Sequence, residues 1–208
     1  MRTARPSLLT LFSVLTILSV QAVQDGFATD AITAEGQNLV KKLDDLDVEH
    51  RWLPGFTIEW KSGKSLNPVT EKGVHTHCSA FAASACDQLN IPLLSPPPQG
   101  NLANRQADWL LDEGQKKGWK LVNATDAQNL ANHGVVVVAS FKNTDANYHG
   151  GHGHIAVIRP SNKSVEAIQK EGPQITQAGG HNYNSAPLSD GFAAKIRPLV
   201  KFFAFQPN

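Results

Sequence analysis

Cys78 and His154 are the two residues whose types and positions could together support nucleophilic chemistry. Cys78 lies in the small-residue stretch GVHTHCSAFAASACDQL, which predicts a helix with Thr76 as its N-cap and Cys78 as its second residue. The first turn of a helix offers free N–H groups and the positive end of the dipole, and both favour a thiolate. The same N–H groups can stabilise an oxyanion. This position therefore suits a nucleophile, and a structural cysteine gains nothing from it.

A thiol nucleophile needs a general base, and histidine is the natural candidate because its pKa lies near neutrality. His154 begins the apolar stretch HIAVIRP directly after the glycine-rich segment KNTDANYHGGHG. We expect a strand here that projects the imidazole from a rigid scaffold. Its face would include Ala156 and Ile158, while Ile155 and Val157 take the other face.

A base of this kind is usually oriented by a third polar group. The stretch GPQITQAGGHNYNS, on the expected next strand, supplies Gln174, Gln177, Asn182 and Asn184. Gln174 and Gln177 are three residues apart and must point to opposite faces of a strand, so only one of them can face His154. The residues alone leave open which of the four polar groups orients the base.

The second cysteine, Cys86, has a different predicted role. If residues 77–90 form a helix, eight residues separate the two cysteines by about 12 Å, whereas disulfide-bonded Cα atoms lie at most about 7 Å apart. An intrachain disulfide is therefore not expected. Cys86 lies among Ala and Ser, which is typical of a buried thiol that acts as a small apolar side chain.

The first 22 residues have the pattern of a secretory signal peptide. Arg2 and Arg5 precede an apolar run from Leu8 to Val20, and Val20 and Ala22 suit a cleavage site after Ala22. An uncleaved anchor helix is the alternative, but a membrane span needs about 20 apolar residues. We therefore expect a periplasmic or secreted protein with no stable membrane insertion after cleavage. Cleavage leaves 17 Lys and Arg against 18 Asp and Glu, and this near-neutral balance argues against a nucleic-acid partner.

The remaining pattern predicts one α+β domain in which helices come first and the strands of an antiparallel sheet follow. Helices are expected at Ile32–Leu46 with Asp30 or Thr33 as cap, from Asn101 to Gly114 or Gly118, and in TDAQNLANHG with Thr125 as cap. Strands are expected at Phe56–Trp60, at Val135–Phe141, and in HIAVIRP, SVEAIQ, PQITQAG and RPLVKFFAFQ. We divide the chain into a signal peptide (1–22), an N-terminal helix and loop (23–65), and a main domain (66–208).

A cysteine at a helix start, the stretch GHIAVI and the stretch ITQAGGHNYNS together resemble the CHAP and NlpC-type families of the papain-like superfamily. The motif strand of those families, Gly-His-apolar-Ala-apolar-apolar, matches Gly153 to Ile158. The similarity covers roughly residues 70–185. It implies a papain-like fold with the nucleophile helix packed on an antiparallel β-sheet, and activity as a peptidoglycan amidase or endopeptidase.

The resemblance also implies site residues. Cys78 would be the nucleophile and His154 the base, acting on peptidoglycan or a peptide with no cofactor and no metal. Gln177 falls nearest the position of a Glu in CHAP domains, and Asn182 is a candidate for the Asn that follows. His77 and His152 are candidates for lining the cleft. Gln177 is neutral, so it could orient the imidazole but would stabilise an imidazolium less than Glu would.

Two other classes of function remain open from the sequence. A binding module for cell-wall or other peptides could keep the same fold without turnover. A metal-binding protein is the second alternative, because Zn²⁺ and copper bind His and Cys and the chain offers His75, His77, Cys78, His149, His152 and His154. The order HTHC matches no standard ligand spacing, and this disfavours the metal hypothesis.

Overall fold

A computed structural model describes residues 29–73, 75–96 and 101–207 of the protein. The predicted signal peptide (1–22) lies outside the described residues, so it stays a prediction. Within the described ranges, no helix combines the length and the apolar character that crossing a membrane requires.

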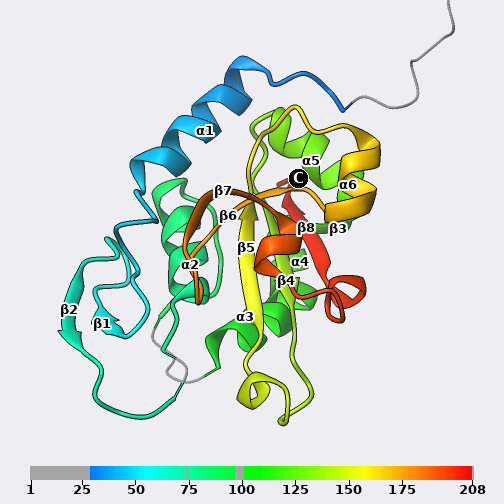
Figure 1. Ribbon diagram of the computed structural model, residues 1–208. Coiled ribbons are helices and arrows are strands. Elements are labelled where there is room, and N and C mark those ends of the chain that lie inside the picture. Colours follow the sequence, from blue (N-terminus) through cyan, green and yellow to red (C-terminus); the bar gives the residue numbers. More distant parts are fainter. Residues whose placement is uncertain (1–28, 74, 97–100, 208) are drawn as a thin grey trace, which may run out of the picture.

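Six antiparallel strands form the central sheet, in the order β3-β8-β4-β5-β6-β7. Their bounds in that order are Trp119–Val122, Lys201–Phe205, Val137–Phe141, His154–Ile158, Gln174–Gln177 and Tyr183–Pro187. A separate two-stranded sheet pairs β1 (Phe56–Ile58) with β2 (Ser65–Pro68). Figure 1 shows β5, in yellow, in the middle of the molecule with α2 beside it.

Helices cover both faces of this sheet, because successive strand residues point to opposite sides. On one face, Ile155 and Val157 pack with side chains from α1 (Ala34–Asp45), α2 (Cys78–Gln88) and α3 (Leu102–Leu111). On the other face, Ala156 and Ile158 pack with α5 (Ala124–Asn132) and α7 (Leu188–Gly191). The remaining helical segments are α4 (Glu113–Lys116), α6 (Val165–Glu171) and the 3₁₀ turns His149–Gly151 and Arg197–Leu199.

The α+β class and the antiparallel sheet are as the sequence pattern predicts. Thr33 caps α1 by accepting a hydrogen bond from the N–H of Gly36. The apolar strands β4, β5, β6 and β8 all fall inside predicted segments. The expected alternation along β5 is also confirmed, since its residues divide between the two cores.

Several local predictions are wrong. His77, not Thr76, is the N-cap of α2, so Cys78 is its first helical residue. Asn123, not Thr125, caps α5, because its side chain accepts from the N–H of Asp126. The segment SVEAIQ forms α6 rather than a strand, since Ser164 accepts a capping hydrogen bond from the N–H of Ala167.

Other elements differ in extent or are new. The helix from Asn101 is interrupted at Asp112, which divides it into α3 and α4. The strands β2, β3 and β7 have no counterpart among the predictions. The predicted boundary between residues 65 and 66 falls inside β2, and Leu43 of α1 shares a core with Phe81 of α2. The division at this boundary remains a prediction.

Candidate active site

The first turn of α2 meets the start of β5, which brings Cys78 and His154 into hydrogen-bonding contact although 75 residues separate them in the sequence. The main-chain N–H groups of Ser79 and Ile155 also act on this sulfur, and both lower the pKa of Cys78. The groups around this sulfur therefore favour a thiolate.

The pKa of Cys78 reflects two opposing effects. Burial by itself raises the pKa of this thiol, because a low-dielectric surrounding disfavours the charged form. The charge of His154 and the hydrogen bonds from its ring and from the two main-chain N–H groups outweigh burial, so the pKa of Cys78 lies below its usual value. No acidic side chain in the first turn of α2 opposes the thiolate.

His154 shows the complementary change. Burial by itself lowers the pKa of this imidazole, while the charge of Cys78 and the hydrogen bonds to Cys78 and Gln177 raise it. The net pKa of His154 lies above its usual value. A lowered thiol pKa beside a raised imidazole pKa favours a thiolate–imidazolium pair.

Gln177, at the end of β6, fixes the orientation of the imidazole. Nε2 of His154 donates to Oε1 of Gln177 over 2.8 Å, and Nε2 of Gln177 donates to the carbonyl oxygen of His181 over 3.2 Å. Because the amide nitrogen of Gln177 bonds His181, the amide oxygen is the atom that faces the ring. An amide oxygen can only accept, so Nε2 of His154 must carry the proton. Because Nε2 is occupied, Nδ1 is the nitrogen left to face the thiol.

Close packing holds this amide and ring in place. The ring of Phe192, which is fully buried, lies with its centroid 4.7 Å from that of His154. Gly191 is directly beside Gln177, and a Cβ at this position would overlap the amide oxygen Oε1. Glycine at 191 is therefore required by the space that the Gln177 amide fills.

A pocket with a volume of about 390 Å³ opens beside His154. Its walls come from the β4–β5 loop, the β6–β7 turn and α7, and they include Tyr148, His149, His152, His181, Tyr183 and Asp190. Thr76 and His154 line the same pocket, while Cys78 does not and is 6% exposed. The thiol therefore borders the pocket only through His154, which lines the pocket and is hydrogen-bonded to Cys78.

The other predicted site residues have separate places. Asn182 does not contact His154: its side chain donates to the carbonyl oxygens of Val48 and Arg51, at 2.7 and 2.8 Å, and accepts from the N–H of Gly179. Asn182 therefore ties the β6–β7 turn to the segment after α1.

Of the two histidines predicted to line the cleft, only His152 lines the pocket. His77 caps α2, and its Nε2 is 2.8 Å from the carbonyl oxygen of Phe56 in β1. Burial lowers the pKa of His77. It is a tether between β1 and α2, and the prediction that it lines the cleft is wrong for this pocket.

The open question of which glutamine faces the base is settled by the contacts. Gln177 bonds His154, and Gln174 bonds Oγ of Ser185 instead. Three groups at the site have no signal in the sequence: the N–H of Ile155, the ring of Phe192 and the close contact at Gly191. No sequence pattern marks Phe192 or Gly191 as a site residue. Both lie next to the site only because the chain folds back toward His154 after β7.

The histidines do not assemble into a metal centre. Among the described residues, no group of three or more His, Cys, Asp or Glu side chains could hold a metal ion.

A scan against models of known protein families found no match, and a search of curated proteins found no significant relative.

Proposed function

We propose that this protein is a thiol hydrolase that cleaves amide bonds by covalent catalysis through Cys78. The observation that carries the proposal is the imidazole of His154 beside Cys78 at the start of α2, with Gln177 bonded to the far side of the ring at 2.8 Å. A thiolate held by an oriented imidazole is the arrangement that nucleophilic acyl transfer requires.

In the proposed acylation step, the thiolate of Cys78 attacks the substrate carbonyl carbon and forms a tetrahedral oxyanion. The N–H of Cys78 is at the first position of α2, where no intrahelical acceptor exists, and it stabilises this oxyanion together with the helix dipole. Nδ1–H of His154 then protonates the amide nitrogen, the C–N bond breaks, and an amine leaves behind a thioester.

In the proposed deacylation step, the neutral Nδ1 of His154 takes a proton from water, whose oxygen attacks the thioester carbon. Collapse of the second tetrahedral intermediate breaks the C–S bond and releases a carboxylic acid. The thiolate and the imidazolium are then restored. Atoms and protons balance over the cycle, with one water consumed for each amide cleaved and no cofactor involved.

The papain-like architecture is part of this proposal. Its support is the position of the nucleophile at the start of α2, the packing of α2 on an antiparallel sheet, and the position of the base at the start of the neighbouring strand β5. The sequence resemblance to CHAP and NlpC-type families then favours peptidoglycan stem peptides or the glycan–peptide link as the substrate. Export by the predicted signal peptide, to the periplasm or the medium, would bring the enzyme to that substrate.

Purified protein and its Cys78→Ala variant, incubated with peptidoglycan sacculi, test the proposal. We expect the parent to release soluble muropeptides, identified by mass spectrometry, and the variant to release at least about 10³-fold less. Cys86→Ala is the matched control, since this second thiol lies near the other end of the same helix and burial is the cause of its raised pKa. Equal release by the parent and the Cys78→Ala variant would reject the mechanism. A protein that binds sacculi and releases nothing would instead be a binding module.

A further inference from the structure

Two polar side chains of helix α3 contact the segments that carry Cys78 and His154. The proposed mechanism uses neither of these side chains. Gln106, which is fully buried, donates from Nε2 to the carbonyl oxygens of Ser79 in α2 and of Leu94, at 2.9 and 2.8 Å. Ser79 is the residue directly after the nucleophile in the first turn of α2. Gln106 thus fixes the turn that carries the thiol.

Asn104, two residues earlier in α3, holds the loop that leads to the base. Its Nδ2 donates to the carbonyl oxygens of Asn143 and Gly151, both at 2.9 Å, and its Oδ1 accepts from the N–H of Asn143 at 2.8 Å. Asn101, at the start of the same helix, donates to the same Gly151 carbonyl. The two ends of the β4–β5 loop are therefore fastened to α3.

The loop itself depends on this fastening. Asn143 is 5% exposed and donates from Nδ2 to the carbonyl oxygens of Tyr148 and His152, at 2.6 and 3.1 Å. His149 within the loop has a φ of 46°, in the left-handed region that a non-glycine residue rarely adopts without surrounding support. The loop conformation is thus imposed by its side-chain hydrogen bonds and by the anchor on α3.

The anchor also lies directly against the residue before the base. A Cβ at Gly153 would overlap both Oδ1 of Asn104 and the carbonyl oxygen of Phe141. Glycine at 153 therefore lets the Asn104 amide pack against the backbone, and His154 follows at once as the first residue of β5.

From these contacts we propose that α3 sets the distance between the thiol and the imidazole. Gln106 and Asn104 are the positioning residues for Cys78 and His154, respectively. This inference rests on the proposed function. In physical terms, α2 and β5 are held to one rigid helix by hydrogen bonds on its two sides, so the site is organised before substrate binds. Loss of either anchor lets the sulfur and the ring drift apart, while the fold and both reactive residues remain.

The pH dependence of Cys78 alkylation by iodoacetamide tests this, because thiolate content depends on contact with the imidazole. Asn104→Asp keeps the side-chain size but cannot donate to the two carbonyl oxygens. We expect its alkylation profile to move to higher pH by about one pH unit, which corresponds to about tenfold slower alkylation near pH 6. Gln106→Met, which removes the hydrogen bonds to the carbonyl oxygens of Ser79 and Leu94, should move the profile in the same direction.

Asn132→Asp is the matched control. Asn132 is buried in α5 and has the same kind of contacts: Nδ2 donates to the carbonyl oxygens of Asp30 and Ser161, and Oδ1 accepts from the N–H of Ser161. It belongs to the helix on the opposite face of the sheet. We expect Asn132→Asp to lower the melting temperature by an amount similar to Asn104→Asp, and to leave the alkylation profile unchanged.

The outcomes separate this inference from the proposed function. A parent protein whose Cys78 alkylates only in the ordinary thiol range would reject both. A second outcome is a parent thiol that reacts near pH 6 and variants Asn104→Asp and Gln106→Met whose alkylation profiles superimpose on the parent profile. This would reject the positioning role of α3 and leave the hydrolase proposal standing. Equal shifts in Asn104→Asp and Asn132→Asp would also reject it, since the effect would then be general destabilisation. Asn104→Ser, whose hydroxyl is too short to reach both carbonyl oxygens, provides the same comparison if Asn104→Asp does not fold.

Discussion

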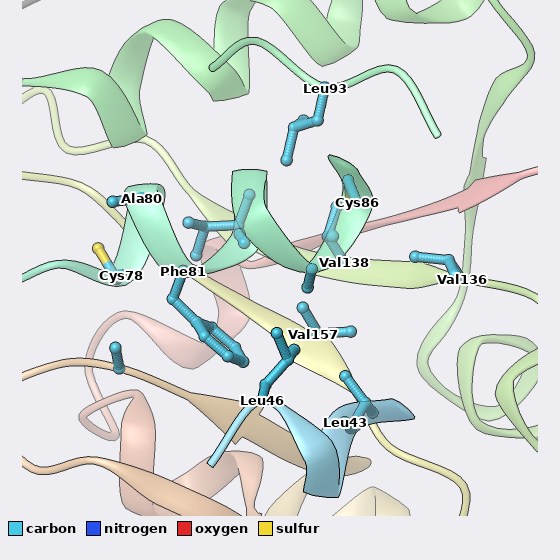
Figure 2. Close-up of a cluster of buried hydrophobic side chains, with 14 of the residues drawn as sticks. Leu43, Leu46, Cys78, Ala80, Phe81, Cys86, Leu93, Val136, Val138 and Val157 are labelled. Atoms are coloured by element: carbon cyan, nitrogen blue, oxygen red, sulfur yellow. The ribbon is translucent and has the colours of Figure 1, made fainter. Parts of the chain in front are cut away.

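The two ends of α2 place the same side chain in two opposite electrostatic settings. Cys78, at the N-terminal end, has His154, Ser79 and Ile155 as neighbours that favour the charged thiolate, and its pKa lies below the usual value. Cys86, eight residues on, is fully buried with no such partner, and burial raises its pKa to about 12. Figure 2 shows Cys86 in the same region of the core as the apolar side chains of Leu93, Val136 and Val138, while the sulfur of Cys78 lies at the other end of the helix.

The contrast shows that burial does not decide whether a thiol is inert. Both cysteines are free, and both are removed from most solvent contact. Desolvation raises the pKa at both positions, and only at Cys78 do nearby N–H groups and an imidazole reverse its effect.

Selective alkylation should show the largest difference. At about pH 7, a thiol with a pKa of about 12 holds about 10³-fold less thiolate than one with the usual value of 9.0, and the lowered pKa of Cys78 widens this gap. We expect iodoacetamide to label Cys78 more than about 10³-fold faster than Cys86, as measured by peptide mass spectrometry. The Cys78 rate should rise with pH only up to its lowered pKa and then level off. Comparable labelling of both cysteines would contradict the assigned environments.

His154→Gln should make Cys78 resemble Cys86. The substitution removes the cationic charge and the ring hydrogen bond, while the effect of burial remains, so the pKa of Cys78 should rise. We expect amide hydrolysis to fall by about 10²–10⁴-fold, the usual contribution of a general acid–base group. Alkylation of Cys78 near neutral pH should slow in parallel. Unchanged alkylation would show that the main-chain N–H groups alone stabilise the thiolate.

Gln177→Ala should give an intermediate loss. It frees the imidazole to rotate and removes a hydrogen bond that raises the pKa of His154. We expect kcat to fall about tenfold, in the range found when a supporting residue next to a functional ligand is removed. Gln177→Glu should keep the orientation and add a negative charge, so the alkaline limb of the pH–rate profile should move to higher pH.

Gly191→Ala probes the same amide from its other side. The added Cβ overlaps Oε1 of Gln177, so the variant should displace the amide without changing any hydrogen-bonding side chain. The double variant Gly191→Ala/Gln177→Ala should be no slower than Gln177→Ala alone, because both changes remove one interaction. Fully additive losses would show that Gly191 acts independently of Gln177.

Cys86→Ala should have the smallest effect, and on stability only. Removing one buried sulfur from the core lowers the free energy of unfolding by about 1 kcal/mol, and the activity should remain at the parent level. Cys86→Ser should cost more, about 1–3 kcal/mol, because its hydroxyl would be buried without an assured partner. Denaturant unfolding measures both values. A loss of activity in Cys86→Ala at unchanged stability would contradict the purely structural role of this thiol.

The sequence pattern predicted the parts of the site that follow from local periodicity. The small-residue run gave the helix that begins near Cys78, and the β-branched run gave the strand that begins at His154. Thr76 was wrongly assigned as the cap, because helix ends depend on backbone dihedrals that neighbouring elements influence. SVEAIQ was wrongly assigned as a strand, and it forms α6 with Ser164 as its N-cap.

Residue types and spacing by themselves determined that this chain has one cysteine at a helix start, one histidine at a strand start, and two glutamines of which only one can face that histidine. These features depend on the periods of helices and strands, which short stretches of sequence encode. The fold is what brings Cys78 to His154 and makes Gln177, not Asn182, the partner of the ring. The hydrogen bonds from α3 to the segments that carry both residues also depend on the fold. Those contacts join residues far apart in the chain, and they depend on how the helices pack on the sheet as a whole.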